Sequence, residues 1–155
     1  AKNFDLIIKT FNKNGKRLNI YGTGILGDHL KSIASRNIEF VGRVSDDELV
    51  SLYKGAKAFI AAQKDEDFGI TIIEAAAAGC PAIAFKGEGY LETIVEGKTG
   101  VFFSEPTEES LTNAIKNFEK IKLAPRDCIK HAEKFSEERF SDEITKLVRS
   151  VTKDK

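Results

Sequence analysis

Two spacings of hydrophobic residues alternate along the chain, and together they predict an α/β fold. Phe4, Ile7, Ile8 and Phe11 recur every three to four residues, as on one face of a helix that ends before Gly15. Short apolar runs elsewhere predict strands. The expected strands lie at about 18–21, 38–41, 57–62, 82–85 and 101–103, and the expected helices at about 4–14, 28–35, 46–53, 69–78, 90–95, 107–120, 125–135 and 136–152. Because helices separate the strands, we expect a Rossmann-like parallel sheet with right-handed crossovers and flanking helices.

The stretch from Asp65 to Pro81 contains the most informative pattern. Between Gly69 and Phe85 the single charged side chain is Glu74. Four consecutive alanines favour a helix here, and the glycine and proline that follow end it. We therefore expect Glu74 in the second turn of a short, buried helix, where a carboxylate is costly unless it is hydrogen-bonded.

The start of this helix is a candidate anion site. The free amides of a helix N-terminus attract phosphate above all. At about 1.5 Å per residue, Glu74 lies roughly 6–8 Å along the axis from those amides. Glu66 comes just before them, so the sequence predicts a phosphate with one carboxylate on each side.

Composition narrows the class of protein. The 155 residues suit one domain, and 24 basic residues balance 24 acidic ones. Zero net charge argues against nucleic acid or an anionic membrane as the main partner. Cys80 and Cys128 make neither a disulfide framework nor a zinc pattern, so we expect a reduced, cytoplasmic compartment. Methionine is absent even at the first position, which suggests a fragment or an engineered piece.

A second glycine-rich segment leaves three interpretations open. Gly22–Gly27 reads G-x-G-x-x-G between an expected strand and an expected helix, the context of the dinucleotide fingerprint. An NAD site needs an acid about 20 residues on, at the end of the next strand. Glu39 is the one candidate, and it falls inside the strand. The other interpretations are a loop beside a diphosphate and a plain packing turn.

The residues around the central stretch resemble a known family. Glu66 and Glu74 form an E-x7-E pair within EDFGITIIEAAAAGCPAIA, and this resembles the donor-binding signature of retaining GT-B glycosyltransferases. The Glu-Asp-Phe-Gly-Ile form is similar to the mannosyltransferase branch, which makes GDP-mannose a candidate donor. The resemblance also covers residues 37–44, 46–49, 87–95 and 97–101. It implies that residues 1–155 are a nucleotide-sugar-binding domain, one half of a GT-B architecture, whose reaction requires no metal or other cofactor.

The resemblance implies a role for each candidate residue. Glu74 would bind the ribose, and Glu66 would act at the transferred sugar as the catalytic carboxylate. The backbone of Phe68, Gly69 and Ile70 would reach the sugar and the distal phosphate. The remaining candidates would lie along the diphosphate and the base: Gly22 and Gly24, Lys2 beside the leaving phosphate, and Arg43 near the base. Asp65-Glu66-Asp67 also reads as D-x-D, a metal signature of another glycosyltransferase fold, but we expect no metal here.

The chain departs from the family pattern at its start. It opens on a helix, where the family's domain opens on a strand that ends in Gly-Arg, so the first strand and the phosphate-binding arginine are expected to be missing. The acceptor-binding domain is also expected to be missing, and another domain or chain would supply it, along with any peripheral membrane association. We therefore expect transfer of a hexose from a nucleotide diphosphate sugar with retention, weak or lost in these residues alone. The alternatives are a non-catalytic nucleotide-binding or scaffold module and, less favoured, an NAD-binding Rossmann domain.

Overall fold

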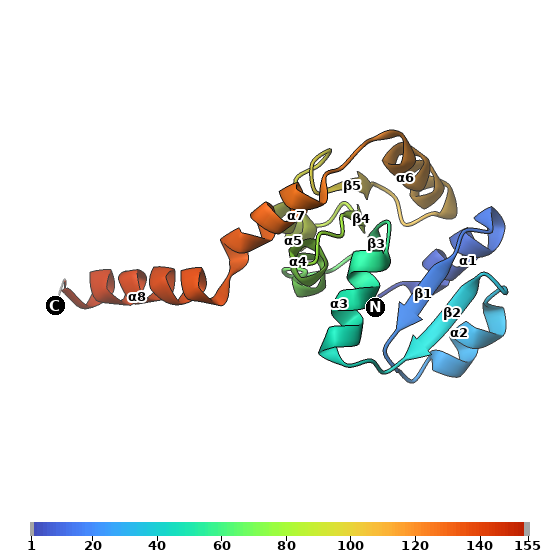
Figure 1. The fold of residues 1–155 in the computed structure, drawn as a ribbon, viewed down its shortest axis with the longest axis horizontal. Coiled ribbons are helices and arrows are strands. Elements are labelled where there is room, and N and C mark those ends of the chain that lie inside the picture. The colour runs from blue at the N-terminus through green and yellow to red at the C-terminus, as the bar shows by residue number, and fades with distance from the viewer. Residues whose placement is uncertain (1, 154–155) are drawn as a thin grey trace.

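Five parallel strands and their connecting helices form the body of the computed structural model, which describes residues 2–153 (Figure 1). The strands are β1 (Leu18–Tyr21), β2 (Ile38–Gly42), β3 (Phe59–Ala61), β4 (Ala82–Phe85) and β5 (Gly100–Phe103). The helices are α1 (Phe4–Asn14), α2 (Gly27–Ile33), α3 (Asp46–Gly55), α4 (Ile70–Ala77), α5 (Glu88–Thr93), α6 (Glu108–Lys120), α7 (Pro125–Ala132) and α8 (Glu137–Lys153), with a 3₁₀ turn η1 (Glu133–Phe135). The order and type of the elements predicted from the hydrophobic pattern are confirmed.

The strands form two sheets, not the single sheet that we expected. β1 pairs with β2, and β4 lies between β3 and β5, with every pair parallel. All four residues of β4 are buried, whereas β1 and β3 keep partly exposed residues. β1 and β3 are not hydrogen-bonded to each other. In the doubly wound strand order 3-2-1-4-5-6, the two sheets match the positions on either side of the central strand.

One hydrophobic core nevertheless joins the two sheets. Most of its buried members come from α1, both sheets and α6: Leu6, Ile8, Phe11, Ile20, Ile38, Ile83, Phe85, Val101, Phe103, Leu111 and Ile115 are among them. The 3.6-residue spacing of apolar side chains on α1 and α6 explains this arrangement, because each helix turns one stripe inward. The body therefore holds both sheets in a fixed relation even where no ladder connects them.

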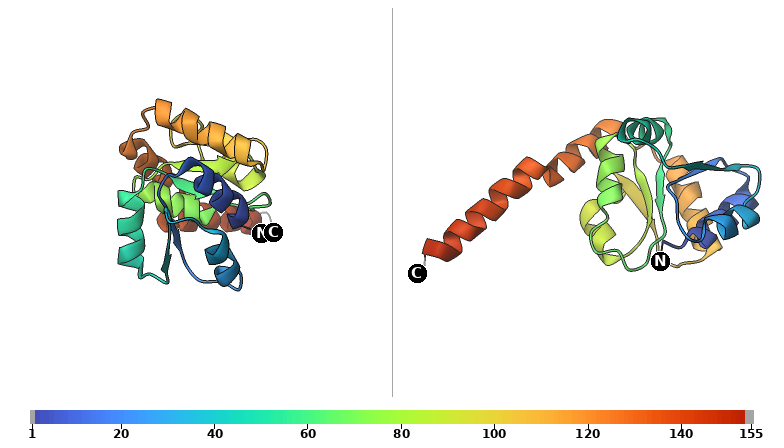
Figure 2. Two further views of the ribbon diagram at one scale, coloured as in Figure 1. Left: turned by 90° about the vertical axis from the view of Figure 1, so that its right-hand side faces the viewer. Right: turned by 90° about the horizontal axis from the view of Figure 1, so that it is seen from below.

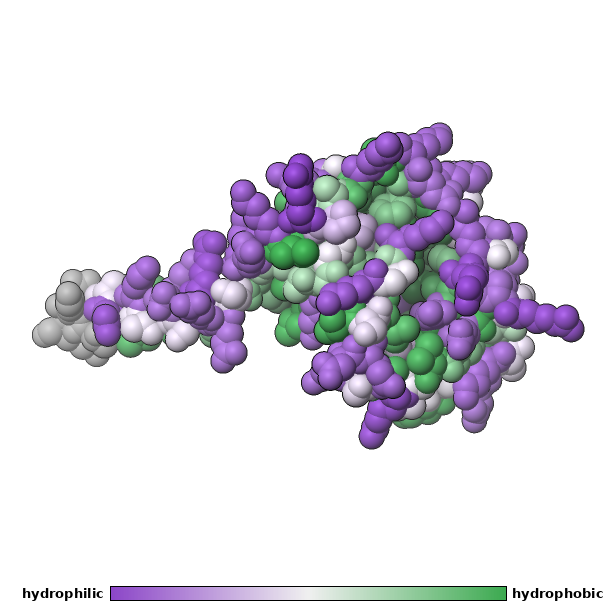
Figure 3. Space-filling model, in the orientation of Figure 1, coloured by the Kyte–Doolittle hydropathy of each residue, from purple (hydrophilic) through white to green (hydrophobic). Residues whose placement is uncertain are grey.

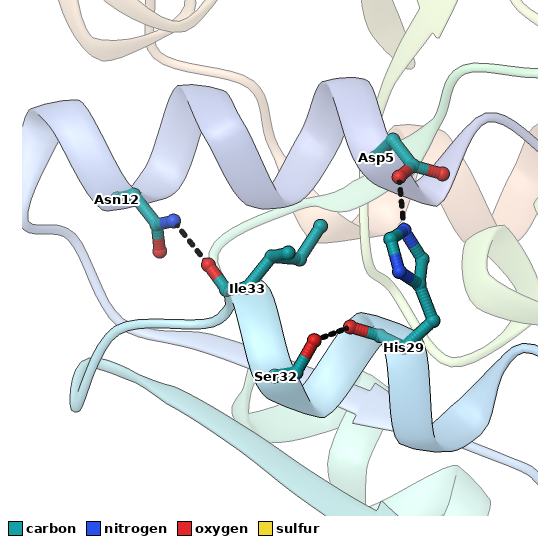
Figure 4. A network of polar contacts seen from close by, with 5 residues as sticks. All are labelled: Asp5, Asn12, His29, Ser32 and Ile33. Carbon is teal, nitrogen blue, oxygen red and sulfur yellow. Dashed lines mark hydrogen bonds and ion pairs between the residues drawn. The ribbon is translucent and has the colours of Figure 1, made fainter.

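Polar contacts align α1 with α2 at both ends (Figure 4). Near their starts, His29 Nε2 lies 3.1 Å from Asp5 Oδ1. Near their ends, Asn12 Nδ2 donates to the carbonyl of Ile33 at 2.7 Å. The two helices are therefore parallel, and the first turn of α1 lies beside the first turn of α2, which follows the glycine turn after β1.

Helix α8 projects away from the body in both views that display its length (Figures 1 and 2). Its apolar residues remain exposed, Phe140, Leu147 and Val151 among them. On the face drawn in Figure 3, apolar surface gathers on the body, whereas the α8 stalk shows mostly polar and intermediate residues. None of the helices within residues 2–153 combines the length and the apolar character needed to cross a membrane.

Ser45 caps the N-terminus of α3. The Glu48 amide donates to Ser45 Oγ at 3.4 Å, and the Ser45 amide donates to Glu48 Oε2 at 2.8 Å, which completes a capping box. We expect Ser45→Ala to lower the free energy of unfolding by about 1 kcal/mol, as is typical of a lost N-cap. Urea unfolding measures this change. Ser51→Ala, in the middle of the same helix, is the control, and an equal loss in the control would show that capping is not the cause.

Candidate functional site

The candidate residues gather at the carboxyl ends of the strands. The glycine turn follows β1, Arg43 follows β2, and the loop from Gln63 to Gly69 follows β3. In open sheets of parallel strands, ligands bind outside these ends. The site is thus built from loops held by strands and from the helices that begin there.

Glu74 is exposed, and the expectation that it is buried is wrong. Helix α4 turns Ile72, Ala75 and Ala76 into the core. Because these three residues already occupy the inward stripe of a 3.6-residue helix, Glu74 falls on the outward side. Its carboxylate accepts no hydrogen bond from residues 2–153, so it is free to bind hydroxyl or amide donors of a ligand.

Two tyrosines beside Glu74 belong to this site, and the sequence analysis missed them. The hydroxyls of Tyr21, at the end of β1, and Tyr53, on α3, are 2.7 Å apart. Their rings meet edge to face with centroids 6.0 Å apart. Burial raises the pKa of both hydroxyls, and the negative charge of Glu74 raises them further. The position of Tyr21 directly before Gly22 was the available signal, since the end of a strand at the ligand edge favours a functional side chain.

Glu66 is half-buried and bound within the protein. Its Oε1 accepts a hydrogen bond from the Gly69 amide at 3.1 Å, and its carbonyl accepts one from the Gly89 amide at 3.1 Å. Burial first, and then the charge and hydrogen bond of Glu66, raise the pKa of the Tyr90 hydroxyl. The carboxylate is therefore fixed between the start of α4 and α5.

Gly69 packs against the ring of Tyr90. It is buried with φ 83°, and a Cβ there would lie 2.9 Å from Tyr90 Cδ1. Its amide is already bound by Glu66. The amides of Ile70 and Thr71 have no acceptor within residues 2–153, so these two remain for an anion. Phe68 is exposed and meets Phe135 of η1 edge to face at 5.8 Å.

The residues expected along the diphosphate lie on separate segments at this edge. Gly22 has φ 95°, and its amide donates to the Gly42 carbonyl at 2.7 Å, so the turn after β1 is braced against β2. Gly24, Lys2 and Arg43 are exposed. The Asp5–His29 contact brings the segment after Lys2 close to the helix that follows the glycine turn.

The NAD interpretation lacks its acidic residue. Glu39 lies within β2, opposite Asn19, and the position after β2 is occupied by Arg43. A dinucleotide ribose needs a carboxylate at that strand end. Within residues 2–153, His, Cys, Asp and Glu form no group of three or more that could hold a metal ion.

A depression of about 560 Å³ lies elsewhere, between α1 and the start of α6. It is lined by Lys9, Lys13, Thr107 and Glu108 among others. Lys13 Nζ and Glu108 Oε2 form an ion pair at 2.6 Å beside it. Because the depression does not lie at the carboxyl ends of the strands, it is a weaker candidate than the strand edge.

A fold of parallel strands and covering helices, with a free carboxylate and free helix amides at the strand ends, defines a Rossmann-like ligand-binding domain. The chain belongs to the family "Glycosyl transferases group 1", which it matches over residues 1–135. This match includes every candidate residue named above.

Two curated relatives are glycosyltransferases named for different activities. The chain is 33% identical over 127 residues to alpha-1,3/1,6-mannosyltransferase ALG2 of Mus musculus, which covers 76% of this chain and 30% of that protein. It is 32% identical over 108 residues to a glycogen synthase of Mycobacterium tuberculosis, which covers 66% of this chain and 26% of that protein. The chain thus spans less than a third of the length of these relatives.

Solved structures share the fold along nearly the whole chain. A sucrose-phosphate synthase from Thermosynechococcus elongatus matches with a TM-score of 0.85 at 19% identity, over 99% of this chain and 43% of that chain. A glycosyltransferase from Rickettsia africae matches with a TM-score of 0.87 at 21% identity, over 99% and 45%. These likenesses confirm the α/β, GT-B type of fold.

His131 supports the loop of the site from α7, and its protonation is expected to weaken the fold. Its Nε2 lies 3.1 Å from the Thr93 carbonyl, and its ring meets Phe135, which in turn meets Phe68. Burial, and then the charge of Lys134, lower the pKa of His131 below its usual value. The unfolded chain therefore takes up the proton first, so this contribution to stability is present above about pH 6.5 and is lost as the pH falls.

The pH dependence of the melting temperature tests this expectation. Between pH 7.5 and 5.5, the wild type should lose more thermal stability than His131→Gln, which keeps an N–H donor but does not titrate. Parallel curves for the two proteins would contradict it.

Proposed function

We propose that this chain is the donor-binding domain of a retaining glycosyltransferase that uses a nucleotide diphosphate sugar. One observation carries the proposal: in the E-x7-E spacing, Glu74 presents a free carboxylate while Glu66 is fixed before the same helix. Family membership and the fold support a transferase. The proposal also includes transfer with retention of the anomeric configuration. It includes GDP-mannose as the donor, from which mannose is transferred.

Each end of the donor has a physical match at the site. The two oxygens of Glu74 accept the two hydroxyl protons of a ribose diol. The diphosphate lies over the start of α4, where the free amides of Ile70 and Thr71 and the helix dipole favour negative charge. Lys2 adds a positive charge, and the Gly22–Gly24 turn allows close approach of the backbone. Arg43 lies toward the base.

The reaction then needs little from the protein beyond positioning. The bond between the anomeric carbon and the leaving diphosphate breaks, and the acceptor oxygen bonds to that carbon on the same face. The acceptor proton passes to the departing phosphate oxygen, so no protein nucleophile is required. Glu66, held by Gly69 and Tyr90, places negative charge near the developing oxocarbenium ion.

The acceptor is bound by a part of the enzyme outside these residues. The curated and solved relatives compared above are more than twice as long as this chain. We therefore expect the isolated chain to bind donor and to transfer sugar weakly or not at all.

A thermal-shift panel followed by calorimetry tests the proposal. GDP-mannose, UDP-glucose and ADP-glucose are compared with NAD. At least one nucleotide sugar should raise the melting temperature, because a ligand that binds the folded state stabilises it, and its parent diphosphate should compete. Binding of NAD alone would support a dinucleotide domain, and failure of the whole panel would support a scaffold.

A further inference from the structure

The tyrosine pair beside Glu74 is built into the site from three elements. Tyr53 of α3 packs with Ala75 and Cys80, and Tyr21 of β1 packs against the same cluster. Ala75 is the residue directly after Glu74 on α4. The 2.7 Å contact between the hydroxyls therefore packs against the turn of α4 that carries Glu74, and the charge of Glu74 acts on both hydroxyls.

The direction of this hydrogen bond follows from burial. Tyr53 is only 4% exposed, and the Tyr21 oxygen is its hydroxyl's partner, so the Tyr53 proton must go there. Tyr21 is half-buried, and its own proton is left for another acceptor. The effects of this hydrogen bond on the two pKa values support Tyr53 as the donor and Tyr21 as the acceptor. The bond raises the pKa of Tyr53 and acts to lower that of Tyr21.

The Tyr21 hydroxyl can donate a hydrogen bond to a ligand, whereas the Glu74 carboxylate can only accept one. A carboxylate only accepts, so it satisfies the protons of a ribose diol and leaves the lone pairs of the two hydroxyl oxygens unmatched. A donor beside the carboxylate satisfies one of these oxygens. Tyrosine suits this role because its rigid ring fixes the hydroxyl with few rotatable bonds.

We propose that Tyr21 is a second ribose-binding residue, which donates a hydrogen bond to a hydroxyl oxygen of the nucleotide, and that Tyr53 is its positioning residue. The ligand class is therefore a ribonucleotide, favoured over its deoxy form. This inference rests on the proposed function, because it assumes that a nucleotide lies over Glu74.

The test measures ribose discrimination by the chain. Calorimetry gives the affinities of UDP, GDP and ADP and of their 2′-deoxy and 3′-deoxy forms for wild type, Tyr21→Phe and Tyr53→Phe. For the diphosphate that binds, Tyr21→Phe should lower affinity about 3–10-fold, as for one lost neutral hydrogen bond. The affinity for the deoxy form that lacks the hydroxyl bound by Tyr21 should not change. The ratio of the ribonucleotide affinity to this deoxynucleotide affinity should therefore fall by the same factor. Tyr53→Phe should reduce the same discrimination by a smaller factor, because Tyr21 loses its orienting bond.

A packing control separates this role from a structural one. Phe59 meets Tyr53 edge to face at 5.8 Å and carries no hydroxyl. Phe59→Leu should lower the melting temperature without changing discrimination. Unchanged discrimination in Tyr21→Phe would overturn this inference and leave the proposed function standing. If wild type bound none of the diphosphates, the proposed function would fail, and this inference with it.

Discussion

Replacing Glu74 by alanine is expected to weaken nucleotide-sugar binding by about a hundredfold or more and to leave the fold intact. The carboxylate would lose hydrogen bonds to two ribose hydroxyls, and bonds to charged groups contribute about 1.5–3 kcal/mol each. The side chain is exposed and bonded to no residue within 2–153, so its removal costs the folded state little. Calorimetry measures the affinity, and circular dichroism with thermal melting measures the fold.

Two further variants sharpen this prediction. Glu74→Gln keeps the shape and one acceptor oxygen but loses the charge, so its affinity should fall between those of wild type and alanine. Glu138→Ala removes an exposed carboxylate from α8, the helix that projects away from the body, and should bind as wild type does. Wild-type affinity in Glu74→Ala would remove the ribose role from this residue.

Gly89→Ala is expected to be the most destabilising single substitution at the site. A Cβ at residue 89 would lie 2.5 Å from the Glu66 carbonyl oxygen and 2.6 Å from backbone atoms of Asp67 and Phe68. Backbone cannot rotate away as a side chain can, so the loop that carries Glu66 must move. We expect a loss of about 3 kcal/mol or more in the free energy of unfolding, at the upper end of the cost of overpacking, together with weaker donor binding.

Gly55→Ala is the matched control for this substitution. Gly55 ends α3, its φ lies outside the left-handed region, and a Cβ there would meet no atom within 4 Å. Urea unfolding should therefore give nearly wild-type stability for the control. Similar stability in both alanine variants would mean that the loop is not held against α5 as described.

The elements of the fold were predictable because local rules decide them. The apolar stripe of α1, the capping box at Ser45 and Glu48, and the alternation of strands with helices are all readable within a few residues of sequence. The division into two sheets was harder to foresee. It depends on whether β1 and β3 are hydrogen-bonded to each other. The hydrophobic pattern of each strand does not predict which strand lies beside it.

The sequence led to the candidate residues but not to their contacts. Glu74 was expected to be buried because its neighbours in sequence are apolar, but the helical period, not the average composition, decides which side chain faces inward. Gly69 was expected to let a ligand approach the backbone, and its contact with the Tyr90 ring was not foreseen. The contact between Tyr21 and Tyr53 joins residues 32 positions apart, and no local pattern encodes such a pair.

The most direct measurement is a backbone amide chemical-shift titration of the ¹⁵N-labelled chain with the nucleotide sugar that stabilises it most. The account predicts saturable shifts that are largest at Ile70, Thr71 and Glu74, with further shifts in the Gly22–Gly24 turn. Saturable shifts confined to the depression between α1 and α6 would contradict it, as would saturable binding that leaves the amides of α4 unchanged.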